Sequence, residues 1–199
     1  MGRGMTPILR EETLSMAAKV TGHMHKEELA WLYDTAAGRP MVIEMGSWLG
    51  RSSVALSSAT KLVCVDWWKG SPVEHHIQAI AAGLDPYKEW TENTRDIRTL
   101  RDVTSIKVNL YSNADTSKLI DKLGGCASMV FIDADHEQAK VLVDIETALQ
   151  LAAPGCLICG HDFNHKGVYS AVFESFGKVI NPCKSIWVAE YPAQGQDSR

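Results

Sequence analysis

The sequence predicts an α/β domain in which a mostly parallel sheet is covered by helices on both faces. Short runs that are apolar at nearly every position recur along the chain, and segments with helical spacing of apolar residues separate them. Four of these runs end in acidic or imidazole side chains beside a turn. Apolar strands that alternate with helices are typical of a parallel sheet buried on both faces.

The composition is that of one globular domain. The chain has 199 residues, 45% hydrophobic and 22% charged, which is enough for a single core. A formal net charge of −4 disfavours a nucleic-acid partner, because phosphate binding usually needs a basic surface. The apolar runs are far shorter than the roughly 18 residues that cross a bilayer, and residues 1–15 lack the apolar core of a signal peptide. We therefore expect one cytoplasmic domain over residues 1–199, with no membrane partner.

The five cysteines are expected to be reduced. Their number is odd and they lie largely in apolar segments, which disfavours a disulfide framework. Cys156 and Cys159 have C-x-x-C spacing, but they share one apolar run and no second pair completes a zinc site. They are predicted to be core thiols.

The expected elements alternate between helix and strand. The first part of the chain is expected to hold helices over 1–38, a strand over 41–44, a glycine turn over 46–50, a helix over 52–59 and a strand over 61–65. The second part is expected to hold strands over 106–110, 128–132, 156–159 and 185–189, and helices over 115–123, 137–151 and 169–176. This alternation predicts a doubly wound sheet, with ligands bound beyond the carboxyl ends of its strands.

Residues 67–104 form an insertion that is longer than a usual crossover between strands. A helix is expected within it from about residue 86 to residue 100. Trp67 and Trp68 follow the second strand directly, and large aromatic side chains beyond a strand end commonly line a ligand pocket. We expect this insertion to cover the pocket of a substrate.

The glycine turn and the next strand end suggest a site for a nucleoside. Gly46 and Gly50 allow backbone amides to approach a ligand closely at the start of a helix. Trp48 stands where the dinucleotide fingerprint G-x-G-x-x-G has its second glycine, which speaks against a pyrophosphate there. Asp66 ends the next strand, 20 residues after Gly46, where a carboxylate can accept both hydroxyls of a ribose.

Three segments together resemble one enzyme family. Residues 42–53 look like the first motif of class I S-adenosylmethionine-dependent methyltransferases. Residues 131–136, followed by Asp144, and the proline-glycine strand over 154–163 are similar to later motifs of a small-molecule O-methyltransferase branch that includes macrocin O-methyltransferase and cephalosporin-biosynthesis relatives. The resemblance covers about residues 40–190 and implies a Rossmann-like fold with S-adenosylmethionine as the methyl donor.

The resemblance also implies roles for individual residues. Glu44, Gly46 and Ser47 would hold the amino acid portion of the cofactor, Asp66 the ribose, and Trp67 would lie near the adenine. The full cofactor-binding set implied in this way is Glu44, Gly46, Ser47, Gly50, Ser52, Asp66, Trp67, Ser112, Asn113 and Asp133.

Two alternatives remain for the group that activates the acceptor. Metal-dependent members of the family place one ligand after the fourth strand and two after the fifth, which correspond here to Asp133, His161 and Asp162. Carboxylates suit Mg²⁺ and imidazole suits Zn²⁺, although the second position is more often acidic in those members. Without a metal, His161 or His136 would act as general base beside Asp133, because imidazole titrates near neutrality.

The function expected from these residues is methyl transfer to a small-molecule acceptor, at a hydroxyl oxygen. The alternatives are a nicotinamide-dependent oxidoreductase, which Trp48 disfavours, and a binding module that keeps the cofactor pocket without turnover. The sequence does not identify the acceptor. It is compatible with a homo-oligomer.

Overall fold

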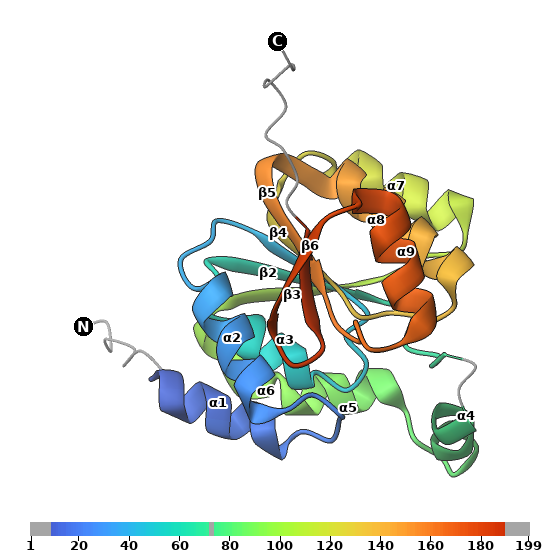
Figure 1. Cartoon of the computed structure of the whole chain (residues 1–199). Helices are drawn as coiled ribbons and strands as arrows, with labels where there is room; N and C mark the ends of the chain where they lie inside the picture. The colour runs from blue at the N-terminus through green and yellow to red at the C-terminus, as the bar shows by residue number, and fades with distance from the viewer. Residues whose placement is uncertain (1–8, 72–73, 190–199) are drawn as a thin grey trace.

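The structure, a computed structural model, describes residues 9–71 and 74–189 and is built on one seven-stranded sheet (Figure 1). The strand order is β3-β2-β1-β4-β5-β7-β6. The first five strands in this order are parallel, β7 is antiparallel to β5, and β6 is antiparallel to β7. The strands are β1 (Val42–Met45), β2 (Lys61–Asp66), β3 (Asp102–Lys107), β4 (Ala127–Ile132), β5 (Ala152–Gly160), β6 (Val179–Cys183) and β7 (Ile186–Ala189). The predicted mostly parallel, Rossmann-like sheet is confirmed.

Helices cover both faces of this sheet. They are α1 (Arg10–Lys19), α2 (Lys26–Ala36), α3 (Arg51–Leu56), α4 (Glu74–Ala81), α5 (Pro86–Asn93), α6 (Arg95–Leu100), α7 (Asn113–Leu123), α8 (Gln138–Leu151) and α9 (Lys166–Phe176). One core cluster joins the sheet to α1, α2, α3, α5 and α6, and the other joins it to α7, α8 and α9. Val42 belongs to the first cluster and Ile43 to the second, because successive strand residues point to opposite faces.

The third strand begins four residues earlier than predicted. It spans Asp102–Lys107 instead of 106–110, and Val103 pairs with Leu62 of β2. β3 is the edge strand on the parallel side, so only one of its residues is fully buried and its apolar pattern is weak. Val108 and Leu110, which suggested the later strand, are buried in the loop that follows. Residues 102–104 therefore belong to the sheet, and the predicted insertion of 67–104 ends at residue 101.

The later half of the insertion is part of the core. The expected single helix is two helices, α5 and α6, which meet at Thr94. α5 begins with Pro86, and Asp85 caps it by accepting a hydrogen bond from the Lys88 amide at 3.1 Å. Trp90 and Ile97 are fully buried against the sheet. The earlier half differs, because α4 lies apart from the layers at the end of a loop (Figure 1).

The two ends of the described chain add detail that the sequence did not predict. The helical region expected over 1–38 is two helices with an irregular segment between them, and its residues 1–8 lie outside the described part. β6 was missed because Asn181 and Pro182 interrupt its apolar pattern. It pairs with β7 as a hairpin at the sheet edge.

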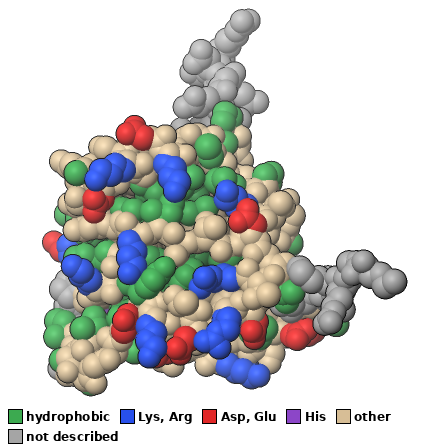
Figure 2. Space-filling view, turned by 180° about the vertical axis from the view of Figure 1, so that it is seen from behind, with side chains coloured by type: hydrophobic (Ala, Val, Ile, Leu, Met, Phe, Trp, Pro, Cys, Tyr) green, Lys and Arg blue, Asp and Glu red, His purple; other side chains and the backbone are tan. Residues whose placement is uncertain are grey.

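Two further observations concern membrane-spanning helices and the distribution of surface charge. No helix in the described part of the chain is long and apolar enough to cross a bilayer. On the face shown in Figure 2, Lys and Arg side chains are interspersed with Asp, Glu and apolar side chains.

Candidate active site

A cavity of about 460 Å³ lies at the carboxyl ends of the parallel strands. Its walls come from the turn after β1, the end of β2 with the segment after it, the loop after β3, and the loop after β4 with one side chain of α8. The lining residues are Gly46, Trp48, Asp66, Trp67, Lys69, Gly70, Ser71, His76, Ile77, Val108, Asn109, Leu110, Tyr111, Asp133, Ala134, Asp135 and Lys140. This is the edge at which parallel sheets bind ligands.

Gly46 brings the β1 turn against the end of β4. Its φ is +89°, and a Cβ at this position would lie 2.1 Å from the carbonyl oxygen of Asp133 and 2.7 Å from the Cα of Ala134. No other residue fits at such a separation. The predicted requirement for glycine at this turn therefore has a steric cause, namely the close approach of two backbone segments.

Trp48 forms one wall of the cavity. Its φ of +43° is uncommon for a residue with a side chain, and such backbone conformations cluster at functional sites. Its ring stacks on His76 of α4, with centroids 3.8 Å apart, and its carbonyl accepts a hydrogen bond from the Trp68 indole at 2.9 Å. From the sequence, Trp48 was recognised only as a departure from the G-x-G-x-x-G fingerprint and was not predicted to belong to the site. A large aromatic residue in a turn at a strand end was the available signal.

Asp66 ties the turn to the end of β2. Its Oδ2 accepts hydrogen bonds from the amides of Ser47 at 2.9 Å and Trp48 at 2.8 Å, and its Oδ1 accepts one from the Trp68 amide at 2.6 Å. Burial raises the pKa of Asp66, and these amides oppose that effect. Asp66 lines the cavity together with the adjacent Trp67, and its contact with a ribose stays a prediction.

Glu44 lies beneath the turn in a buried cluster of hydroxyl groups. It accepts hydrogen bonds from Ser47 at 2.6 Å and from Ser52 and Ser53, both at 2.5 Å. The indole of Trp90 in turn donates to Ser53 at 3.1 Å. Burial raises the pKa of Glu44, which these hydroxyl groups oppose. None of these side chains lines the cavity, so their contacts support the turn from behind.

Three other predicted cofactor residues lie off the cavity wall. Gly50 precedes α3, and a Cβ there would meet Trp90 and Thr94 of the insertion. Ser112 and Asn113 begin α7, whereas the residues that reach the cavity are those just before them, 108–111. Contact of Ser112 and Asn113 with the cofactor stays a prediction.

Tyr111 connects the cavity to a buried carboxyl group. Its hydroxyl donates to Oδ2 of Asp144 at 3.3 Å. Asp144 is fully buried on α8, and burial raises its pKa to about 8. From the sequence, Asp144 was recognised only as part of a motif, and this contact with Tyr111 was not predicted.

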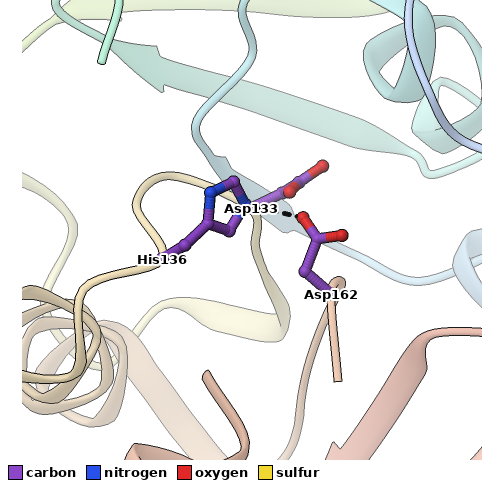
Figure 3. A group of neighbouring side chains, drawn as sticks. All are labelled: Asp133, His136 and Asp162. Atoms are coloured by element: carbon purple, nitrogen blue, oxygen red, sulfur yellow. Dashed lines mark hydrogen bonds and ion pairs between the residues drawn. The ribbon is translucent and has the colours of Figure 1, made fainter. Parts of the chain in front are cut away.

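A cluster of three polar side chains adjoins the cavity through Asp133 (Figure 3). Asp133 follows β4, His136 lies three residues later, and Asp162 follows β5. One potential ligand atom from each lies within 4.8 Å of the others, and Nε2 of His136 is 2.7 Å from Oδ2 of Asp162.

Each member of this cluster has a shifted pKa. Burial raises the pKa of Asp133 to about 7, partly opposed by the nearby charge of His161. Burial would also raise the pKa of Asp162, but its hydrogen bonds with His136 and His161 hold it below the usual range. The hydrogen bond to Asp162 raises the pKa of His136. Asp162 is therefore ionised at neutral pH.

His161 is not a member of this group of three, in contrast to the predicted set of Asp133, His161 and Asp162. Its ring is 7% exposed, and both nitrogens face oxygen atoms. Nε2 lies 2.9 Å from the Ser185 hydroxyl and 3.3 Å from Oε1 of Glu28, and Nδ1 lies 3.3 Å from Oδ2 of Asp162. Burial alone would lower the pKa of His161, but hydrogen bonds to these two carboxylates raise it to about 11. Both ring nitrogens of His161 are therefore in contact with oxygen atoms of neighbouring side chains.

A comparison with known protein families identifies one family. A family model described as a methyltransferase domain matches residues 43–163. A search of curated protein sequences gave no match.

Solved structures share the fold at low sequence identity. An O-methyltransferase from Bacillus cereus in complex with S-adenosylhomocysteine (SAH) has a TM-score of 0.61 at 17% identity, over 94% of this chain and 94% of that chain. An SAH-bound methyltransferase from Podospora anserina has a TM-score of 0.58 at 15% identity, over 92% and 87%. The cofactor-bound protein Rv0187 from MTB has a TM-score of 0.61 at 14% identity, over 90% and 87%.

The family match includes the glycine turn, Asp66 and Asp133, which are the residues that bring three strand ends to the cavity. It decides against the alternative of a nicotinamide-dependent oxidoreductase. The match covers more than half of the chain, and the fold is similar to that of solved methyltransferases. The chain belongs to the methyltransferase domain family and is a class I S-adenosylmethionine-dependent methyltransferase.

Proposed function

We propose that this methyltransferase transfers its methyl group to a hydroxyl oxygen of a small molecule, within the cavity at the carboxyl ends of β1, β2 and β4. The observation that carries the proposal is that Asp66 and Asp133, from two strand ends, line one cavity on either side of the Gly46 turn. Its volume of about 460 Å³ is in the range of small-molecule sites. The fold of the SAH-bound O-methyltransferase from Bacillus cereus and the motifs of the macrocin and cephalosporin branch support oxygen as the acceptor atom.

The cofactor would be held at the β1 and β2 side of the cavity. Asp66 would bind the ribose, and the adenine would lie near Trp67 and Tyr111, whose side chains are both 40% exposed. The bound cofactor supplies a methyl group on a sulfonium, which needs only to be aligned with the acceptor oxygen. The segment over 67–81, which contributes six lining residues, would cover the acceptor and exclude water.

His136, which adjoins the cavity through Asp133 but does not itself line it, would take the proton from the acceptor hydroxyl. Asp162 holds Nε2 of its ring at 2.7 Å, which leaves Nδ1 as the nitrogen that accepts the proton. A carboxylate that orients an imidazole in this way also stabilises the imidazolium that forms. Asp133, at the cavity wall, would stabilise the same charge.

The divalent ion implied by the resemblance does not fit these residues. In the predicted set, both nitrogens of His161 face oxygen atoms that need their hydrogens. In the set of Asp133, His136 and Asp162, the carboxylate Oδ2 of Asp162 already lies between the two imidazoles, and a cation there would lie beside the charged ring of His161. We therefore assign no step to a metal.

The test is SAH release by the purified chain from S-adenosylmethionine, with a panel of small aromatic, sugar and aliphatic hydroxyl compounds. His136→Asn should lower the rate by roughly 10²–10⁴ for any compound that is methylated, because proton transfer is lost. His165→Asn is the matched control, since His165 is an exposed neighbour whose ring lies 5.1 Å from that of His136. Full activity of folded His136→Asn, or methylation confined to amines, would contradict the proposal.

A further inference from the structure

The buried histidine at the end of β5 is enclosed by groups from three distant parts of the chain and by its neighbour Asp162. Nε2 of His161 faces Ser185 at 2.9 Å and Glu28 at 3.3 Å. Nδ1 faces Asp162 at 3.3 Å and Asp133 at 3.7 Å. The indole of Trp187 donates to the His161 carbonyl at 3.1 Å, which fixes the backbone of the same residue.

Glu28 is a fixed anion in this arrangement. It is fully buried on α2, and it accepts hydrogen bonds from the amides of His25 at 2.7 Å and Ser185 at 2.9 Å, and from the Ser185 hydroxyl at 2.7 Å. Although burial alone would raise its pKa, the hydrogen bonds from His161, His25 and Ser185 lower it to about 2. A buried carboxylate needs a cation close by, and His161 supplies it.

The orientation of the ring follows from these contacts. A ring nitrogen that faces a carboxylate oxygen carries a hydrogen, and here the two nitrogens face carboxylates on opposite sides. This arrangement fits an imidazole with a hydrogen on each nitrogen, which is its positively charged form. Its Nδ1 faces the carboxyl groups of Asp133 and Asp162, which are two of the three residues that the sequence suggested as metal ligands.

We propose that the imidazole of His161, held by Glu28 and Ser185, neutralises Asp133 and Asp162 in the place that a divalent cation would fill, so that this chain binds no metal at its active site. The role of this site in methyl transfer rests on the proposed function, but the assignment of the charge does not. The N-terminal helix α2 thereby contributes a side chain to the active site, although Glu28 is 133 residues away from His161 in sequence.

Binding of Mn²⁺ tests this assignment in three chains. Wild type should leave the electron paramagnetic resonance signal of free Mn²⁺ unchanged. His161→Asp places a third carboxylate at the strand ends, where oxygen ligands suit such an ion, and should bind it. In His161→Asn, the new side chain has the size of aspartate without its charge, so this variant is the matched control. His161→Asn should bind Mn²⁺ more weakly than His161→Asp. The difference should exceed the roughly 10- to 100-fold that residues hydrogen-bonded to metal ligands contribute to metal affinity.

Two results in this experiment would overturn the proposal. One is stoichiometric binding of Mn²⁺ to wild type that is lost in Asp162→Asn. The other is a folded His161→Asp that binds Mn²⁺ no better than His161→Asn. A separate measurement is the binding of SAH to wild type with and without a chelator, which distinguishes failure of the proposed function from failure of the charge assignment. Absence of SAH binding would contradict the proposed function and leave the Mn²⁺ comparison valid, whereas loss of SAH binding on chelation would count against the charge assignment.

A measurement on wild type keeps the proposal testable if the variants do not fold. Nitrogen-15 spectra of the imidazole should show both ring nitrogens of His161 carrying hydrogen at neutral pH. In Glu28→Gln, which keeps the shape and removes the charge, one nitrogen should move toward the shift of an unprotonated nitrogen. An unprotonated ring nitrogen in wild type would overturn the proposal.

Discussion

The turn after β1 depends on the absence of a side chain at Gly46, where two backbone segments meet. Gly46→Ala should lower the free energy of unfolding and abolish SAH binding, because its Cβ would displace Asp133 from the cavity wall. Gly38→Ala is the matched control, since Gly38 has φ +74° but no atom within 4 Å of the added Cβ. The control should lose only the roughly 1–2 kcal/mol of left-handed backbone strain. Urea unfolding and calorimetry of SAH binding measure both effects, and equal losses in the two variants would contradict the steric argument.

The hydrogen bond between His136 and Asp162 predicts the pH dependence of the reaction. A general base works in its neutral form, so the rate should rise with pH through the pKa of His136. Asp162 raises that pKa above its ordinary value of about 6.5, so the midpoint should lie above it.

Asp162→Asn should move this midpoint back toward the ordinary value, because the carboxylate that stabilises the imidazolium is gone. The measurement is the pH profile of kcat/KM for wild type and variant with any acceptor that the panel identifies. Coincident midpoints in the two profiles would show that His136 is not the titrating base.

The insertion after β2 has two parts: α5 and α6 belong to the core, and the segment before them lines the cavity. α5 and α6 bury Trp90 and Ile97, whereas Ile77 on α4 is 56% exposed. Amide hydrogen exchange should therefore be slow in residues 86–100 and faster in residues 67–71 and 74–81, because local opening is easiest where few apolar contacts are made. SAH should slow exchange in 67–81, since six of these residues line the cavity. Equal protection of both halves in the free protein would contradict this division.

The sequence predicted most elements correctly where burial on both faces made their patterns clear. β1 and β4 were recognised because nearly all their residues are buried. β3 and β6 lie at the two edges of the sheet, where exposed polar residues weaken the pattern, and they were shifted and missed respectively. The one expected helix is divided at Thr94, a fully buried residue whose backbone angles of φ −97° and ψ 3° depart from helical values.

At the scale of the whole molecule, the site is assembled by contacts between segments distant in sequence. Local patterns identified Gly46, Asp66 and Asp133, because strand ends and a glycine turn can be read from the neighbouring residues. They could not show that Glu44 points away from the cavity to three serine hydroxyls. Nor could they show that His161 faces Glu28 of α2, because that contact exists only once α2 packs beside the end of β5.

Methyl transfer in this cavity requires one binding site for the methyl donor, at Asp66. Calorimetry of SAH binding to wild type, to Asp66→Asn and to Asp121→Asn tests this most directly, since Asp121 is exposed on α7 and is not among the lining residues. We predict one site in wild type and in Asp121→Asn. Asp66→Asn should bind more weakly by about 1–3 kcal/mol, the usual effect of losing a hydrogen bond to a charged group. No binding to folded wild type, or equal affinity in Asp66→Asn, would contradict the account.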